Sequence, residues 1–326
     1  MDIITVENLT KKYVTYKRGS GFGEALKGLF VREKIEVTAV DDISFAVKRG
    51  SICGLIGPNG AGKSTTIKML CGTLYPTSGA ISSLGMSPYA ARERYVRKIG
   101  AVFGQRSQLV WDIPPVDSFN MNRAIYGIPH ADYRSRLAHL AGLFEIEEVM
   151  QKPTRVLSLG ERMKCEFIMA MLHNPEIVFL DEPTIGLDIL AKTKIREFIR
   201  ELNASGTTFI LTTHDLEDVG QLAEHIIIVN HGKVVFDGAT EKLHQYVGEK
   251  KIIELTLTNP LNPTILHEMN VRLLQKKSSH EIVIEVDTEK TPIGAFIENL
   301  SQKIHFADIS IKSLPMEEII AKIYSD

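Results

Sequence analysis

Four short apolar runs, rich in isoleucine, valine, phenylalanine and leucine, recur along the chain and are separated by stretches with helical character. They occupy residues 51–56, 99–103, 177–181 and 208–213. A strand that is buried on both faces carries a continuous apolar run, and such strands form parallel sheets when they alternate with helices. The pattern therefore predicts an α/β core built on a mostly parallel sheet.

Alternating apolar and polar positions mark strands of a different kind near the N-terminus. Residues 3–8 and 43–49 alternate in this way and predict two antiparallel strands. Between them, residues 15–34 form a basic, glycine-bearing insertion. This insertion is either a solvated loop with a short helix or a surface that rests against anionic lipid or a partner protein.

Two further patterns complete the core. Residues 115–172 carry helical periodicity without a strong strand, which predicts a helical subdomain inserted into the α/β core at about residues 106–172. Strand-like runs return at residues 225–229 and 233–236, on either side of a His-Gly turn.

The composition shifts near residues 238–251, and a small α+β unit follows. Alternating strands are predicted around residues 253–257, 282–286 and 306–311, with helices from Pro263, from Pro292 and at the C-terminus. None of these segments carries a motif that we would assign to catalysis. We therefore expect two domains, residues 1–240 and residues 241–326.

Composition narrows the class of protein. Among the 326 residues, 44% are hydrophobic and 24% are charged, as in an ordinary globular protein, and the net charge of −2 gives no general attraction to nucleic acid. The three cysteines lie far apart in apolar segments, so we expect small core residues in a reducing compartment, without a disulfide or a metal site. Apolar runs are too short for a membrane span, and the N-terminus lacks a signal-peptide layout. If the protein acts at a membrane, another chain must supply the spanning helices.

The sequence GPNGAGKS at residues 57–64 fits a phosphate-binding loop. A predicted strand precedes it and a predicted helix follows, so backbone N–H groups and the positive end of the helix would surround a phosphate chain. Lys63 would reach the β- and γ-phosphates, and the Ser64 hydroxyl would bind Mg²⁺. The predicted nucleotide site comprises Gly57, Pro58, Asn59, Gly60, Ala61, Gly62, Lys63, Ser64 and Thr65.

The apolar run at residues 177–180 ends in two acids, Asp181 and Glu182. At the carboxyl end of a parallel strand beside the phosphate loop, Asp181 would hold Mg²⁺ through water. Glu182 would polarise the attacking water as a general base. Together with the phosphate loop, these acids predict hydrolysis of a nucleoside triphosphate.

The segment LSLGER at residues 157–162 resembles the LSGGQ signature of ATP-binding-cassette (ABC) ATPases. In that family the signature caps a helix, and its serine and backbone N–H groups bind the γ-phosphate held by the opposite subunit. Ser158 and Gly160 match the family pattern, whereas Leu159 replaces a glycine and Glu161 replaces the glutamine. The resemblance implies phosphate capture by Ser158 and Gly160, and it leaves open the contacts that the family's glutamine makes.

Other family motifs occur in register. Gln105 matches the glutamine that contacts Mg²⁺ and water, and His214 matches the switch histidine that orients the general base. Residues 186–188 match the loop that couples the two sites of the dimer. Tyr13 matches the aromatic residue that stacks on adenine, with Tyr16 as a nearby alternative. The resemblance thus implies catalytic roles for Glu182, His214 and Gln105, metal ligation by Ser64, Gln105 and Asp181, and nucleotide contacts from Tyr13, Gln105, Asp181, Ser158 and Gly160.

The resemblance covers about residues 1–238 and implies a P-loop NTPase fold of the ABC type, with a mostly parallel sheet, an antiparallel β subdomain and an inserted helical subdomain. The small α+β domain would be attached to it. A head-to-tail dimer, expected to be a homodimer, would hold two ATP molecules and Mg²⁺ between its subunits and close when ATP binds. The implied partner is an integral membrane permease, without nucleic acid, and the implied location is the cytoplasmic face of the cell membrane.

The branch of the family is indicated by the phosphate loop, the LSLGER variant, the insertion and the C-terminal domain. Together they resemble ATPases of type-two ABC exporters, in the viologen- and multidrug-exporter-like group. Residues 109–119, which include Trp111, would either receive the permease or pack the helical subdomain. We expect an exporter ATPase. One alternative is an importer ATPase. Another is a soluble ABC ATPase of ribosome, repair or chromosome systems, and the single cassette disfavours this second alternative.

Overall fold

The computed structural model describes residues 1–16, 34–104, 106–213, 215–246, 250–260, 266, 269, 271–288, 290–314 and 316–325. It divides into two compact units, Met1–Gly238 and Ala239–Asp326, each of which is described by itself. Most of the expected insertion, most of the helix expected from Pro263, and the motif residues Gln105 and His214 lie outside the described residues. Within the described residues, no helix combines the length and the apolar character that crossing a membrane requires.

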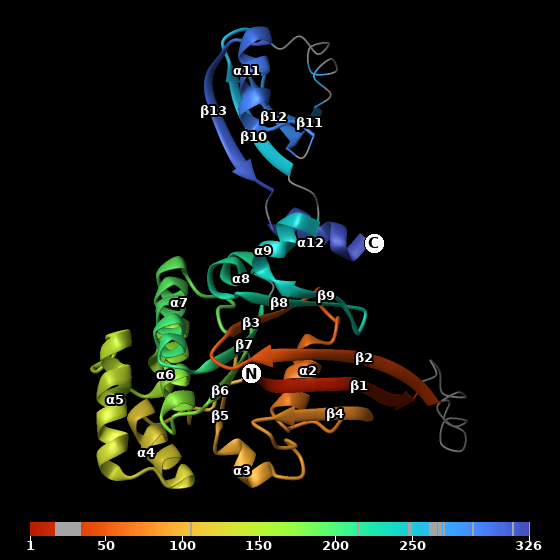
Figure 1. The fold of residues 1–326 in the computed structure, drawn as a ribbon. Helices are drawn as coiled ribbons and strands as arrows, with labels where there is room; N and C mark the ends of the chain where they lie inside the picture. The colour runs from red at the N-terminus through yellow and green to blue at the C-terminus, as the bar shows by residue number, and fades with distance from the viewer. Residues whose placement is uncertain are drawn as a thin grey trace, which may run out of the picture. The chain divides into compact units, whose positions relative to one another are not determined.

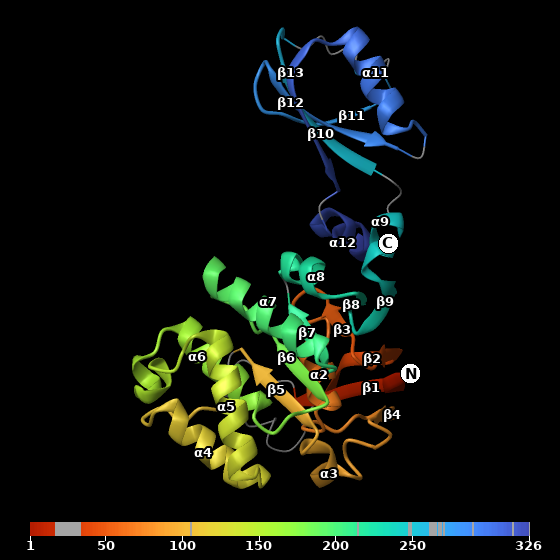
Figure 2. The same cartoon turned by 60° about the vertical axis from the view of Figure 1, so that its left-hand side comes forward.

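A mostly parallel sheet forms the centre of the first unit (Figures 1 and 2). Its strands lie in the order β5 (Ile99–Phe103), β6 (Ile177–Asp181), β7 (Thr208–Thr213), β3 (Ile52–Ile56), β8 (His225–Asn230) and β9 (Lys233–Ala239). Neighbouring strands from β5 to β8 run parallel. The apolar runs noted in the sequence are therefore strands of one sheet, and the predicted α/β class is confirmed.

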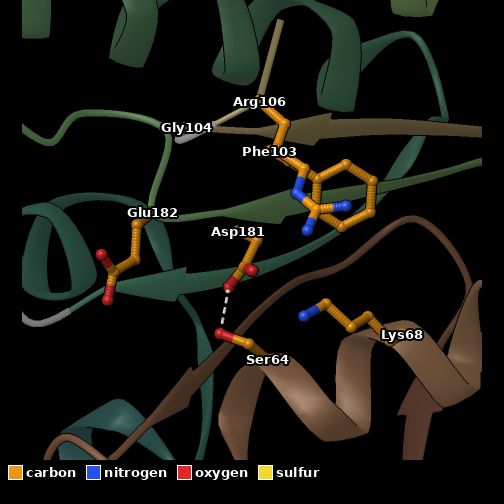
Figure 3. Close-up of a pocket in the computed structure, with 7 residues that line it drawn as sticks. All are labelled: Ser64, Lys68, Phe103, Gly104, Arg106, Asp181 and Glu182. Atoms are coloured by element: carbon orange, nitrogen blue, oxygen red, sulfur yellow. Dashed lines mark hydrogen bonds between the residues drawn. The ribbon is translucent and has the colours of Figure 1, made fainter. Parts of the chain in front are cut away.

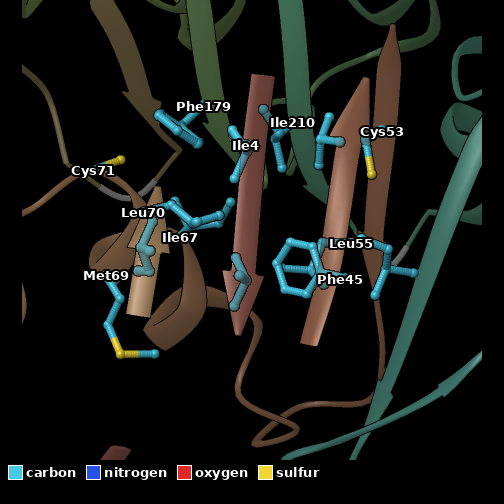
Figure 4. Close-up of a cluster of buried hydrophobic side chains, with 14 of the residues drawn as sticks. Ile4, Phe45, Cys53, Leu55, Ile67, Met69, Leu70, Cys71, Phe179 and Ile210 are labelled. Carbon is cyan, nitrogen blue, oxygen red and sulfur yellow. The ribbon is translucent and has the colours of Figure 1, made fainter. Parts of the chain in front are cut away.

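Side chains alternate between the two faces of this sheet. In β6, Ile177 and Phe179 join a core that includes α2 (Lys63–Leu70) and the N-terminal strands (Figure 4), whereas Val178 and Leu180 are fully buried outside that core. Cys53 and Cys71 belong to the same core, and burial raises the pKa of their thiols far above the ordinary range. Burial on both faces explains why these strands read as continuous apolar runs.

The N-terminal sheet is antiparallel and has the order β2 (Lys34–Lys48), β1 (Asp2–Tyr16) and β4 (Ser78–Ser83). The strands predicted at residues 3–8 and 43–49 are present, but the β1–β2 ladder continues as far as the pair Tyr16 and Lys34. Placing residues 15, 16 and 34 in an insertion was therefore wrong. The outer part of the ladder is exposed on both faces, although Ile35 and Val37 alternate there with polar residues.

Helices fill the stretch between β5 and β6. They are α4 (Pro115–Tyr126), α5 (His130–Phe144) and α6 (Leu159–Met171), with short 3₁₀ turns at Val149–Gln151 and Thr154–Val156. Phe144 of α5 stacks on Phe198 of α7 (Ile189–Ala204) with ring centroids 4.1 Å apart, and Phe167 of α6 meets Phe198 edge-on at 5.8 Å. This aromatic contact joins α5 and α6 to the helix that follows β6.

The second unit is a small α+β fold. Its antiparallel sheet has the order β11 (Arg272–Lys276), β12 (Glu281–Asp287), β10 (Lys250–Leu257) and β13 (Phe306–Ser313). The chain leaves β12 through α11 (Ile293–Lys303) and returns at β13, with β10 lying between those two strands, which is a split β-α-β connection. Apolar residues of β10 and β12 pack against Phe296 and Leu300 of α11. The helices α9 (Thr240–Tyr246) and α12 (Met316–Ser325) flank this sheet in the sequence.

Candidate nucleotide site

The phosphate loop joins β3 to α2, and two of its glycines are required by their surroundings. A Cβ atom at residue 57 would lie 2.2 Å from the carbonyl oxygen of Val229, and one at residue 62 would lie 2.4 Å from that of Ala39. Gly62 also has a φ of 106°, which favours glycine. The loop borders a cavity whose described lining is Ala39, Asn59, Gly60, Ala61, Gly62, Lys63, Ser64, Thr65 and Glu182. The structure thus gathers most of the predicted loop around one hollow.

Lys63 lies inside this loop and is 5% exposed. Its ammonium group donates hydrogen bonds to the carbonyl oxygens of Gly57 at 2.7 Å and Pro58 at 3.1 Å. Burial lowers the pKa of Lys63, while the charges of Glu182 and Asp181 act in the opposite direction. The ammonium is therefore held at the loop by neutral acceptors that a phosphate oxygen could replace.

Ser64 and Asp181 meet at the carboxyl end of β6. The Ser64 hydroxyl donates a hydrogen bond of 3.0 Å to Asp181 Oδ1 (Figure 3), and the Thr212 hydroxyl donates one of 2.6 Å to the same oxygen. Thr212 is the β7 residue paired with Asp181. Two of the three residues predicted to hold a metal ion are therefore adjacent, and Thr212 fixes the carboxylate; the third, Gln105, lies outside the described residues.

Glu182 follows β6 with a φ of 52°, which is uncommon outside glycine. Its backbone N–H donates to the Thr212 carbonyl oxygen at 3.0 Å. Its side chain borders the loop cavity and a second one, whose described lining is Ser64, Lys68, Phe103, Gly104, Arg106, Asp181 and Glu182 (Figure 3). Glu182 therefore lies where a water molecule beside a bound γ-phosphate could be activated.

The second cavity contains residues that the sequence analysis did not single out. Lys68 and Arg106 point into it from opposite sides (Figure 3). The spacing of four from Ser64 to Lys68 on one helix could have suggested the first of these. Gly104 closes the wall, because its N–H donates to the Asp181 carbonyl oxygen at 2.9 Å and a Cβ there would meet the Glu182 carbonyl oxygen at 2.3 Å.

The predicted signature lies at a different place. Ser158 caps the N-terminus of α6, and a Cβ at Gly160 would lie 3.3 Å from that of Ala191 in α7. Leu159 packs toward Gly186 in the loop after β6. Neither Ser158 nor Gly160 is in the described lining of the two cavities. Within one chain, the signature and the phosphate loop are therefore separate surfaces.

Tyr13 is also outside both linings. It lies in β1 opposite Val37, is 41% exposed, and has the Lys11 ammonium 5.3 Å from its ring centroid. Tyr16, the alternative, is 45% exposed on the same strand. Both rings are accessible, and the structure favours neither for adenine.

Known proteins resemble this chain over most of its length. A family model described as "ABC transporter" matches residues 40–185. The chain is 31% identical over 216 residues to "ABC transporter ATP-binding protein NatA" of Bacillus subtilis, which covers 66% of this chain and 88% of that protein. It is 30% identical over 264 residues to "Daunorubicin/doxorubicin resistance ATP-binding protein DrrA" of Streptomyces peucetius, covering 81% of this chain and 78% of that protein. The "Linearmycin resistance ATP-binding protein LnrL" of Bacillus subtilis is 28% identical over 281 residues, covering 86% and 90%.

Solved structures agree on the fold. The "Structure of ATP binding subunit of ABC transporter" has a TM-score of 0.63 at 27% identity and covers 75% of this chain and 93% of that chain. A dimeric ATP-binding cassette in a post-hydrolysis state with ADP and Pi has a TM-score of 0.61 at 24% identity and covers 72% and 98%. The phosphate loop, the acids at the end of β6 and these matches converge on one conclusion, and the resemblance noted in the sequence is confirmed. The chain belongs to the ABC transporter family, as a protein that binds and hydrolyses ATP.

Proposed function

We propose that this chain is the ATPase subunit of an ABC exporter and powers a separate integral membrane permease from the cytoplasmic face of the membrane. Export is supported by relatives whose names describe Nod factor export, linearmycin resistance and daunorubicin/doxorubicin resistance. Permeases of this kind carry the substrate pocket, so the ATPase would supply only the power stroke.

A single observation carries the arrangement of this ATPase. The phosphate loop, Asp181 and Glu182 share one pair of cavities, whereas Ser158 lies outside both linings at the start of α6. This separation supports a signature that binds the γ-phosphate of another copy of the chain. The proposed assembly is a head-to-tail homodimer with two composite sites, each formed by one phosphate loop and the partner's signature.

Mg²⁺ fits the donors at the end of β6. The Ser64 hydroxyl and the Asp181 carboxylate are oxygen ligands 3.0 Å apart, and Gln105 would add an amide oxygen. The ion would neutralise charge on the β- and γ-phosphates. Thr212 would keep Asp181 oriented, because its hydroxyl already binds Oδ1.

The chain's own groups would then divide the chemistry of hydrolysis. Lys63 and the loop N–H groups would hold the phosphates, with Lys63 exchanging the Gly57 and Pro58 carbonyl oxygens for phosphate oxygens. Glu182 would accept a proton from the attacking water as the general base, and His214 would orient Glu182. Tyr13 would stack on adenine.

The remaining parts of the chain take no part in hydrolysis and are assigned other roles. Residues 109–119, in the helical subdomain of about residues 106–172, would contact the permease, since Val110 and Trp111 are 41% and 50% exposed. Residues 1–240 would form the cassette, and residues 241–326 an accessory domain.

Replacing Glu182 with Gln tests this function. The rate at which the variant releases phosphate from ATP should fall at least about a hundredfold, because the amide accepts no proton from water. It should still bind ATP and should form an ATP-dependent dimer that gel filtration resolves. Glu93→Gln, an equal change of charge at an exposed position of α3 (Arg92–Val96), should behave as the parent chain. Hydrolysis at the parental rate by the Glu182 variant would refute the assignment of the base.

A further inference from the structure

The signature of this chain is held by one of its own side chains. Ser158 is the N-cap residue of α6, and Glu161 is the third residue of that helix. Glu161 Oε2 accepts two hydrogen bonds of 2.8 Å, one from the Ser158 backbone N–H and one from the Ser158 hydroxyl. The Glu161 N–H in turn donates to Ser158 Oγ at 3.3 Å. These contacts form a reciprocal capping box.

This arrangement uses the donors that a phosphate would need. A serine hydroxyl has one proton, and here that proton is directed at the carboxylate oxygen of Glu161. The Ser158 backbone N–H points at the same oxygen. An incoming γ-phosphate oxygen would therefore compete with a ligand that is already bound and that carries the same sign of charge.

The charge of Glu161 also acts on the end of the helix. The N-terminus of a helix carries partial positive charge, and an acid in its first turn offsets that charge. Hydrogen bonds from Ser158, and then nearby Lys152 and Lys164, hold the pKa of Glu161 below its ordinary value. The carboxylate is consequently ionised at neutral pH.

We propose that Glu161 is a latch on the signature, which occupies the Ser158 hydroxyl and N–H in the open chain and has to be displaced when the signature closes on the ATP of a second copy. Glu161 is thus a positioning residue that acts through Ser158, and it weakens ATP-driven closure. A neutral glutamine at this position accepts weaker hydrogen bonds from the Ser158 hydroxyl and N–H, so these donors are released more readily. The proposal rests on the composite dimer site described above.

A simpler role makes a different prediction. If Glu161 only stabilises the first turn of α6, its replacement by Gln lowers thermal stability and leaves the ATP requirement of the dimer unchanged. A latch lowers the ATP requirement whether or not stability changes. Gln also completes capping boxes, so the variant is expected to fold.

The test uses the full chain with Glu182→Gln, so that the ATP-bound dimer accumulates, and measures dimer formation by sedimentation velocity against ATP concentration. Adding Glu161→Gln should lower the half-maximal ATP concentration by about two- to fivefold, the effect of one charge at a helix terminus. Adding Glu93→Gln, an equal charge change in the first turn of α3, should not shift it.

A second pair of variants shows whether the effect passes through the serine. In a chain that already carries Ser158→Ala, the change Glu161→Gln should lower the ATP requirement by less than it does with Ser158 in place, because the hydroxyl is absent and only the backbone N–H remains to be released. An unchanged or higher ATP requirement when Glu161→Gln is added to the Glu182→Gln chain would overturn the latch. If Glu182→Gln alone gives no ATP-dependent dimer, the composite site itself is wrong, so the two failures are distinguishable.

Discussion

At the scale of single residues, the glycines of the phosphate loop differ in what they tolerate. Gly57 is confined by the backbone of β8, since a Cβ would approach the Val229 carbonyl oxygen to 2.2 Å. Gly60 has a positive φ of 83° but has open space around it. The first constraint is steric and the second is conformational only, so the two positions separate these effects within one loop.

Substitution by alanine should therefore have unequal effects at the two positions. Gly57→Ala forces the strand or the loop to move, and we expect it to lower the free energy of unfolding by about 3 kcal/mol and to abolish ATP binding. Gly60→Ala meets no atom and should cost about 1–2 kcal/mol for its left-handed backbone, with ATP still bound. Urea denaturation and fluorescent-nucleotide titration measure both quantities. Equal losses in the two variants would show that backbone conformation, and not the approach to Val229, sets the requirement.

The residues that sequence reasoning found at the site are those in contiguous motifs. The loop at residues 57–64 and the acids Asp181 and Glu182 are each announced by their immediate neighbours in the chain. Thr212 and Arg106 are not, because Thr212 reaches the site through strand pairing with Asp181, and Arg106 through the turn after β5. A contact such as that of Thr212 with Asp181, made between two strands of a sheet, produces no recognisable spacing of residues in the sequence.

At the scale of elements, a buried polar cluster ties the loop after β6 to two helices. The Thr184 hydroxyl donates to Asp218 Oδ2 at 2.5 Å, and Arg196 Nε of α7 lies 3.1 Å from Asp218 Oδ1. Asp218 belongs to α8 (Leu216–Leu222) and is 2% exposed, while Arg196 is 5% exposed. The Arg196–Asp218 contact is an ion pair without the alignment of a hydrogen bond. Its stabilisation is therefore Coulombic, and Arg196 also donates a hydrogen bond of 3.1 Å to Glu217 Oε1.

Removing one partner of this pair should be worse than removing both. Asp218→Leu leaves the buried guanidinium with Glu217 as its remaining acid, whose Oε1 lies 3.1 Å from Nη1 of Arg196, and we expect a loss of about 3 kcal/mol in the free energy of unfolding. The double variant Arg196→Met with Asp218→Leu should regain much of that loss, because apolar side chains of similar volume need no counter-ion. Equilibrium urea denaturation of Arg196→Met, Asp218→Leu and the double variant checks the result. A double variant as unstable as the sum of the single variants would contradict the coupling.

Two strands that escaped sequence reasoning share one property, which is a scarcity of buried apolar side chains. In β4, Ile81 is the large apolar residue of the strand, and in β11 the sequence RLLQK mixes two leucines with charged and amide residues. Both strands lie at the edge of their sheets. Edge strands derive their order from pairing with a neighbour, so their sequences carry a weak pattern.

At the scale of the whole molecule, each of the two units has a hydrophobic core among its described residues. One lies between the central sheet, α2 and the N-terminal sheet of the unit Met1–Gly238, and the other lies under α11 in the unit Ala239–Asp326. The described cavities that contain the ATP-site residues are lined by the first unit alone. ATP should therefore stabilise the first unit without acting directly on the second.

Differential scanning calorimetry should resolve this division as two transitions. ATP at a hundred times its dissociation constant should stabilise the transition of the first unit by about 2.7 kcal/mol and leave the other in place. Leu300→Ala, at a fully buried position of α11, should lower only the transition of the second unit, by about 2–5 kcal/mol. Leu9→Ala, equally buried in β1, is the matched change for the first unit and should lower the ATP-sensitive transition instead. A single transition that responds to ATP and to both substitutions would mean that the two cores unfold as one cooperative structure.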